Sequence, residues 1–99
     1  MAAPRAREAG DVQELTIRAE NFGYAPALAV ARSGVPVRLS VTTDNTTGCT
    51  RLFTIPSLNV QEVLPQTGVV TFDLPALPQG DLVFSCGMGM YGGVIRVEG

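Results

Sequence analysis

Residues 82–97 read LVFSCGMGMYGGVIRV, and this stretch indicates the fold more clearly than any other part of the chain. Its first five residues alternate between apolar side chains, which would face a core, and the outward-facing Val83 and Ser85. This period of two is typical of a half-buried β-strand. A glycine-rich loop follows, and a second strand-like run covers residues 94–98. The stretch therefore predicts two strands joined by a tight loop.

The same pattern recurs along most of the chain. Alternating side chains, or short apolar runs between turn residues, cover residues 15–20, 27–31, 35–42, 51–55, 58–64, 70–74, 82–86 and 94–98. The seven prolines and eleven glycines leave no run of ten residues with a helical period. About eight short strands with half-polar faces predict an all-β domain, either an antiparallel two-sheet sandwich or a small barrel.

Length and charge limit the domain organisation and the partners. Ninety-nine residues suffice for one compact domain, which we expect over residues 12–99, after a flexible lead-in or linker over residues 1–11. The basic start and the stop just after a strand-like run are expected of a domain cut from a larger protein. A formal net charge of −2 offers no basic surface for nucleic acid or an anionic membrane. No apolar run approaches the roughly 18–20 residues of a membrane span, so we expect no direct membrane insertion by this segment.

The absence of histidine from the sequence excludes most familiar catalytic sites. A Ser-His-Asp triad, a Cys-His nucleophile pair and a histidine-ligated zinc are all impossible. The carboxylates are scattered, and none are paired at a spacing that favours acid–base catalysis. The sequence thus predicts a protein that is not an enzyme.

Sulfur ligands, in contrast, are concentrated in one loop. Cys86, Met88 and Met90 stand at alternate positions, and the intervening glycines allow the backbone to curl closely around an ion. If the loop that contains Cys49 lies beside them, two thiolates and two thioethers form a four-sulfur metal site. Thiolate and thioether ligands select Cu(I), whereas zinc has little affinity for thioethers, and calcium and magnesium need oxygen ligands.

Simpler interpretations stand beside this one. A structural disulfide between Cys49 and Cys86 would account for both cysteines without a metal. The methionines Met88 and Met90 would in that case fill gaps in the core. Two flexible residues at positions i and i+2 of a glycine-rich loop do not form one packed face, however, which favours the metal site.

Other side chains near these loops have two interpretations each. Phe22 and Tyr24 are expected to be core aromatics rather than parts of a ligand platform. Arg51 either neutralises part of the charge of a two-thiolate site or lies on a solvated strand face. Tyr91 either shields the metal or marks a docking surface, or it is an exposed loop aromatic.

Two segments of the sequence resemble cupredoxin domains. The first is FGYAP at residues 22–26, which leads into residues 28–30 and then into SGVPV at residues 33–37. The second is the cysteine-containing loop, which ends in Met90 and runs straight into the final strand. The resemblance covers about residues 12–99 and implies a Greek-key β-sandwich that holds copper at one end.

The resemblance implies that some copper ligands are kept and others exchanged. Cys86 matches the copper thiolate of the family, and Met90 matches the axial methionine. Cys49 stands where family members carry their first histidine ligand, and Met88 stands where they carry the second. Blue-copper electron transfer rests on two imidazoles and a thiolate, so a site with sulfur in both histidine places is expected to hold Cu(I) far better than Cu(II).

The sequence is similar, more closely, to cupredoxin-like domains that are appended to bacterial membrane proteins of heavy-metal handling, including transporter-like proteins of the sulfite-exporter type. This resemblance implies a Cu(I)-binding domain for copper trafficking. Its partners would be a copper donor or acceptor protein or a tethered transporter, on an extracytoplasmic face of the membrane. Two alternatives stay open: an electron-transfer cupredoxin with altered ligands, and a metal-free interaction module stapled by a Cys49–Cys86 disulfide.

Overall fold

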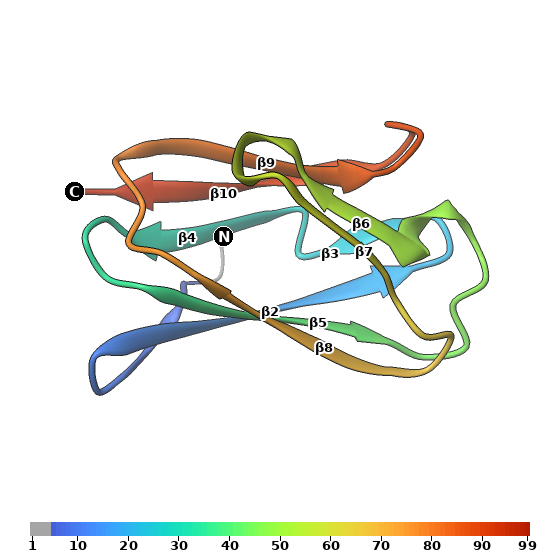
Figure 1. Cartoon of the computed structure of the whole chain (residues 1–99), viewed down its shortest axis with the longest axis horizontal. Helices are drawn as coiled ribbons and strands as arrows, with labels where there is room; N and C mark the ends of the chain where they lie inside the picture. The colour runs from blue at the N-terminus through green and yellow to red at the C-terminus, as the bar shows by residue number, and fades with distance from the viewer. Residues whose placement is uncertain (1–4) are drawn as a thin grey trace.

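The computed structural model describes residues 5–99, which form two five-stranded β-sheets packed face to face (Figure 1). In chain order the strands are β1 Arg7–Ala9, β2 Val12–Glu20, β3 Gly23–Ala25, β4 Leu28–Arg32, β5 Val37–Thr43, β6 Leu52–Ile55, β7 Val60–Val63, β8 Gly68–Leu74, β9 Gly80–Cys86 and β10 Gly92–Glu98. Two single 3₁₀ turns, η1 Cys49–Arg51 and η2 Pro56–Leu58, flank β6. The described residues contain no α-helix. The all-β class is confirmed, and two separate sheets make a sandwich rather than a closed barrel.

Each sheet combines one parallel strand pair with antiparallel pairs. The first sheet has the order β1-β2-β5-β8, with β3 also paired to β2, and β2 runs parallel to β5. The second has the order β4-β10-β9-β6-β7, and β4 runs parallel to β10. The expectation of purely antiparallel sheets is wrong. The chain passes from β2 through β3 to β4 in the other sheet before it returns to β5, so β5 runs in the direction of β2 (Figure 1).

All eight strand-like runs of the sequence form strands, which are β2 and β4 to β10. Two further strands, β1 and β3, have three residues each, too few to show an alternation. β1 lies within residues 1–11, the expected flexible lead-in. From Arg5 onward, this segment instead contacts both sheets, since β1 pairs with β2 and the Ala6 N–H donates to the Val30 carbonyl oxygen at 2.8 Å. The first four residues of the lead-in lie outside the described residues.

The hydrophobic core lies between the two sheets. Phe53 and Phe84 are fully buried and pack against the ring of Tyr24, with ring centroids 5.4–5.8 Å apart. Tyr24 is therefore a core aromatic, as predicted. Phe22 is not, because residues 21–22 form the turn between β2 and β3 and leave its side chain 85% exposed. The prediction that Phe22 is buried is wrong.

Four connections lie at one end of the sandwich, on the right in Figure 1. They are the β2–β3 turn, the β5–β6 connection that includes η1, the β7–β8 connection and the β9–β10 loop. The C-terminus lies at the opposite end. The two cysteine-containing segments of the sequence therefore share one end of the fold.

Candidate metal centre

The two thiols of the chain lie in contact. Cys86 is the last residue of β9, and Cys49 is the first residue of η1. Cys49 Sγ donates a hydrogen bond to Cys86 Sγ at 3.3 Å, and both side chains are free thiols. Cys86 is buried and Cys49 is half-buried. The structure thus brings together the two thiols that the sequence proposed as ligands, with Cys49 on the solvent side.

The loop after Cys86 curls back tightly on the end of β9. The Gly89 N–H donates to the carbonyl oxygen of Cys86 at 2.9 Å, and the Cys86 N–H donates to the carbonyl oxygen of Tyr91 at 2.9 Å. Gly89 has a φ of +74°, a left-handed conformation that glycine adopts without strain. A Cβ on Gly93 would collide with the Ala27 carbonyl oxygen. Gly89 therefore allows the loop to curl, as the sequence suggested, whereas Gly87 has no positive φ and lies against the Leu52 side chain.

Hydrogen bonds favour the thiolate form of Cys86. Burial acts to raise the pKa of Cys86, but hydrogen bonds from the backbone at Tyr91, from the Cys49 thiol, and from the backbone at Met88 and Met90 outweigh it. The pKa of Cys86 consequently falls from 9.0 to about 7. The pKa of Cys49 is raised, first because its thiol donates to Cys86, and further by burial and the nearby charge of Cys86. Above pH 7 the pair therefore carries one negative charge, on Cys86.

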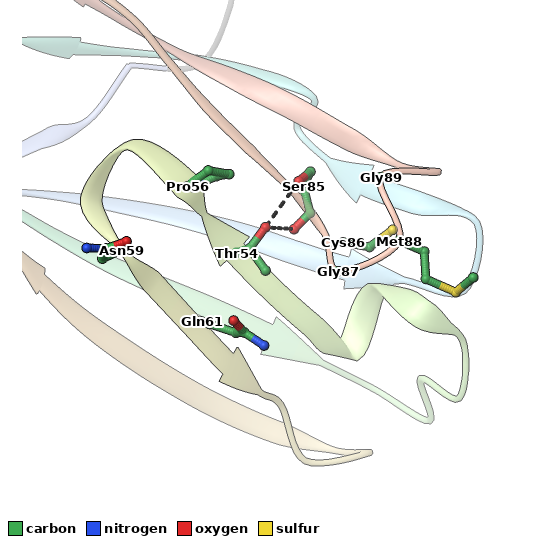
Figure 2. Close-up of a pocket in the computed structure, with 9 residues that line it drawn as sticks. All are labelled: Thr54, Pro56, Asn59, Gln61, Ser85, Cys86, Gly87, Met88 and Gly89. Atoms are coloured by element: carbon green, nitrogen blue, oxygen red, sulfur yellow. Dashed lines mark hydrogen bonds between the residues drawn. The ribbon is translucent and has the colours of Figure 1, made fainter.

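The two methionines of the loop lie at the surface. Met88 is 76% exposed and Met90 is 66% exposed. Figure 2 shows the Met88 side chain directed away from Cys86, on the outer side of the loop. The alternative that these methionines fill the core is therefore wrong. Both thioethers are accessible at the same end of the sandwich as the thiol pair.

A shallow groove that the sequence did not indicate runs beside Cys86, between β6, η2 and the β9–β10 loop (Figure 2). Its lining combines polar side chains, among them Asn59 and Gln61, with apolar ones such as Pro56 and Met88. Thr54 Oγ1 donates to the Ser85 carbonyl oxygen at 2.9 Å and lies 3.1 Å from Ser85 Oγ. In the sequence, these outward-facing polar residues cannot be told from those of any solvated strand. Only the structure places them next to the β9–β10 loop that carries Met88 and Met90.

Tyr24 contacts the turn that contains Cys49, whereas the side chain of Arg51, the last residue of that turn, bonds to Leu64. The Tyr24 hydroxyl donates to the carbonyl oxygen of Thr50 at 2.9 Å, and its pKa is raised, first by burial and then by the two cysteines. Arg51 is half-buried, and its Nε donates to the carbonyl oxygen of Leu64 at 2.9 Å. Arg51 is thus not the freely solvated strand-face side chain that was one of its two interpretations.

Among residues 5–99, no three His, Cys, Asp or Glu side chains gather closely enough to share an ion. Within the same residues, no helix has the length and apolar character needed to cross a membrane.

Comparisons with known proteins agree with the fold. The family model described as a cupredoxin-like domain matches residues 1–97. A search of curated proteins gives no significant match. Among solved structures, this chain resembles the metal binding domain of the Cu(I) exporting P-type ATPase CopA of Streptococcus pneumoniae D39, which was crystallised with Cu(I). The TM-score is 0.90 at 22% identity, over 99% of this chain and 97% of that chain.

Two further solved structures share the fold. A copper binding protein, determined by NMR in the apo form, has a TM-score of 0.88 at 26% identity, over 98% of each chain. Auracyanin from the photosynthetic bacterium Roseiflexus castenholzii, crystallised after reduction with dithionite, has a TM-score of 0.65 at 15% identity. That match covers 91% of this chain and 100% of auracyanin.

Proposed function

This chain belongs to the cupredoxin-like domain family, and on that basis we propose that it is a copper-trafficking domain that binds Cu(I) through Cys49, Cys86, Met88 and Met90. The observation that carries the proposal is the pair of free thiols, whose sulfur atoms lie 3.3 Å apart at one end of the sandwich. These two sulfurs alone would also suit a disulfide. The exposed thioethers of Met88 and Met90, on the loop that follows Cys86, favour a metal site instead.

The distance between the two thiols suits a metal site, and the charge of the four proposed ligands suits Cu(I). A metal–thiolate bond of about 2.3 Å, the length found for zinc, puts two sulfurs of a tetrahedral site about 3.8 Å apart. Cys49 Sγ and Cys86 Sγ would separate by only about half an ångström from their distance of 3.3 Å. Two thiolates and two neutral thioethers give Cu(I) a soft shell with a net charge of about −1.

The exposure of the ligands suits transfer of the ion rather than storage. Cys86 is buried beneath the loop, while Met88 and Met90 reach into solvent and Cys49 is half-exposed. A recipient can therefore approach the thioethers first and replace them one by one, before it displaces the buried thiolate. The copper ion then moves between two proteins without being released as a free ion.

The similar solved structures support a copper function. One is the metal binding domain of a Cu(I) exporting ATPase, and another is a copper binding protein. We extend the proposal to a copper donor or acceptor protein, or a tethered membrane transporter, as the partner, and to an extracytoplasmic location. A topology reporter fused next to this domain in the full-length protein tests the location. A reporter that is active only outside the cytoplasm is expected to be active there. We further propose that the domain is not an enzyme, because four sulfur ligands leave no open position for a substrate.

The direct test is an anaerobic competition titration of the reduced protein with Cu(I) against a colorimetric chelator. The wild-type protein is expected to withdraw Cu(I) from the chelator, and Cys86→Ser is expected to lose most of this affinity. Ser85→Ala is the matched control, because Ser85 precedes Cys86 on the same strand and lines the groove without offering a sulfur ligand. Failure of the wild-type protein to compete, or equal affinity in wild type and Cys86→Ser, contradicts the proposal.

Measurements on the same protein distinguish the two alternative functions. A stable, intensely coloured Cu(II) form with a reversible redox couple would indicate an electron-transfer cupredoxin. A Cys49–Cys86 disulfide in freshly purified protein, with no copper uptake after reduction, would indicate a metal-free interaction module. Thiol counting before and after treatment with a reductant shows whether this disulfide is present.

A further inference from the structure

We infer that the β2–β3 hairpin positions Cys49 against Cys86, and that Asn21 in its turn and Tyr24 in β3 are the positioning residues. The consequence for Cu(I) rests on the proposed function, but the positioning itself concerns only the two thiols. The two cysteines are held very differently. Cys86 ends β9, which lies inside its sheet between β10 and β6. Cys49 begins a single 3₁₀ turn outside both sheets, and that turn has no side-chain cap.

Asn21 supplies an anchor for the segment just before Cys49. Its Oδ1 accepts the N–H of Thr47 at 2.7 Å and the N–H of Gly48 at 3.3 Å, and it lies 3.4 Å from the Thr47 hydroxyl. A Cβ on Gly48 would lie 2.9 Å from the Asn21 carbonyl oxygen. The backbone of this segment is thus pressed directly onto the β2–β3 turn, which leaves no room for a larger residue at position 48.

Tyr24 and the end of β2 anchor the residue just after Cys49. The Thr50 carbonyl oxygen accepts the buried Tyr24 hydroxyl at 2.9 Å, and the Thr50 hydroxyl donates to the carbonyl oxygen of Glu20. The Tyr24 ring is itself fixed by edge-to-face contacts with Phe53 and Phe84. Phe84 lies two residues before Cys86 on β9. Tyr24 therefore contacts both β9, which carries Cys86, and η1, which carries Cys49.

The long-range hydrogen bonds of Thr47, Gly48 and Thr50 therefore lead to residues 20–24. Arg51, further along the same turn, bonds instead to Leu64, and Cys86 is fixed by its own sheet. Loss of either anchor leaves Cys86 in place and allows Cys49 to move away. Two thiols that are held in contact react with a disulfide far more readily than two loosely tethered ones. The equilibrium constant for forming the Cys49–Cys86 disulfide therefore measures how well the two thiols are positioned, and no metal ion is needed.

The test measures the thiol–disulfide equilibrium of the reduced, metal-free protein in glutathione buffers. In this reaction the dithiol protein and one oxidised glutathione give the protein disulfide and two reduced glutathiones, so two electrons and two protons pass to glutathione. Asn21→Ala and Tyr24→Phe are each expected to lower this equilibrium constant about three- to tenfold, the range of one hydrogen bond. Cu(I) affinity, measured by chelator competition, is expected to fall by a similar factor.

Two further variants separate positioning from general stability. Asn21→Asp keeps an oxygen acceptor for the Thr47 and Gly48 N–H groups and is expected to restore the wild-type equilibrium. Gln13→Leu removes a buried amide that bonds to Arg32 and Val35, away from Cys49. It is expected to destabilise the fold while leaving the thiol equilibrium unchanged.

The outcomes are distinct. A lower equilibrium constant in Asn21→Ala and Tyr24→Phe, with wild-type values in Asn21→Asp and Gln13→Leu, supports the inference. Wild-type values in both Asn21→Ala and Tyr24→Phe overturn it, and so does an equal loss in Gln13→Leu. If the wild-type protein binds no Cu(I), the proposed function fails, while the thiol equilibrium still decides the positioning role.

Discussion

Cys49 Sγ donates a hydrogen bond to Cys86 Sγ at 3.3 Å, although the two residues are 37 positions apart in the sequence. The contact joins a 3₁₀ turn to the end of a central strand, so it depends on the whole fold rather than on local sequence. It places two soft donors side by side at a surface that also carries two exposed thioethers. The copper chemistry proposed for this domain rests on this contact together with the two exposed thioethers.

Stability should rise with pH between about pH 7 and pH 9. The folded protein lowers the pKa of Cys86 to about 7 from its ordinary value of 9.0, so in this interval the unfolded chain binds more protons. The contribution is complete above pH 9 and is lost as the pH falls through 7. The raised pKa of Cys49 acts in the opposite direction at higher pH. Urea unfolding midpoints under reducing conditions check this, and Cys86→Ala should show little slope. A slope of the same size in Cys86→Ala would contradict the assignment.

Oxidation should switch off copper binding. Cys49 and Cys86 need to approach by only about 1.3 Å to form a disulfide bond of about 2.05 Å. A disulfide removes both thiolates and leaves only two thioethers, which are neutral and bind Cu(I) weakly. Protein oxidised with excess oxidised glutathione should therefore no longer compete for Cu(I), and dithiothreitol should restore the competition. Equal Cu(I) affinity in the oxidised and reduced protein would exclude the thiols as the main ligands.

The thioethers should contribute less affinity than the thiolates. Met88→Leu and Met90→Leu conserve the side-chain volume at exposed positions, so each should change the free energy of unfolding by less than about 0.5 kcal/mol. Each variant should weaken Cu(I) binding measurably, but by less than Cys86→Ser does. Val83→Leu, at another exposed apolar position, serves as the control with unchanged affinity. Unchanged affinity in the double variant Met88→Leu, Met90→Leu would remove the methionines from the site.

The close packing at the start of β10 should make Gly93 sensitive to substitution. A Cβ at this position meets the Ala27 carbonyl oxygen and the ring of Phe84, so Gly93→Ala should destabilise the fold by about 1–3 kcal/mol. At Gly89 a side chain would meet open space, and asparagine tolerates its left-handed backbone. Gly89→Asn should thus cost clearly less in chemical denaturation. The reverse order of the two variants would show that the loop packs differently.

Much of the fold could be predicted from the sequence because alternation is a local signal. Eight of the ten strands among the described residues show either this alternation or a short apolar run between turn residues, whereas β1 and β3 are three residues long and show neither. The parallel pairing of β2 with β5 could not be predicted, because it depends on where the chain crosses between sheets. Phe22 was misplaced for a similar reason, since an aromatic residue next to a glycine looks alike in a strand and in a turn.

The site was predictable in its chemistry but not in its construction. The residue types Cys, Met and Gly in one loop indicated a soft metal, and the contact of Cys49 with Cys86 was stated as a condition that the structure meets. The anchoring of the Cys49 turn by Asn21 and Tyr24 spans 26 positions and leaves no pattern in the sequence. Whether Met88 and Met90 join the thiols around one ion stays a prediction.

The central claim is that this domain holds Cu(I) in a shell made only of sulfur. X-ray absorption at the copper K-edge of the anaerobically loaded protein measures this directly. The account predicts the edge shape of Cu(I) and a first shell that is fitted by sulfur scatterers alone, with sulfur lost in Cys86→Ser. Nitrogen or oxygen scatterers in the first shell of the wild-type protein, or an edge of Cu(II), would contradict the claim.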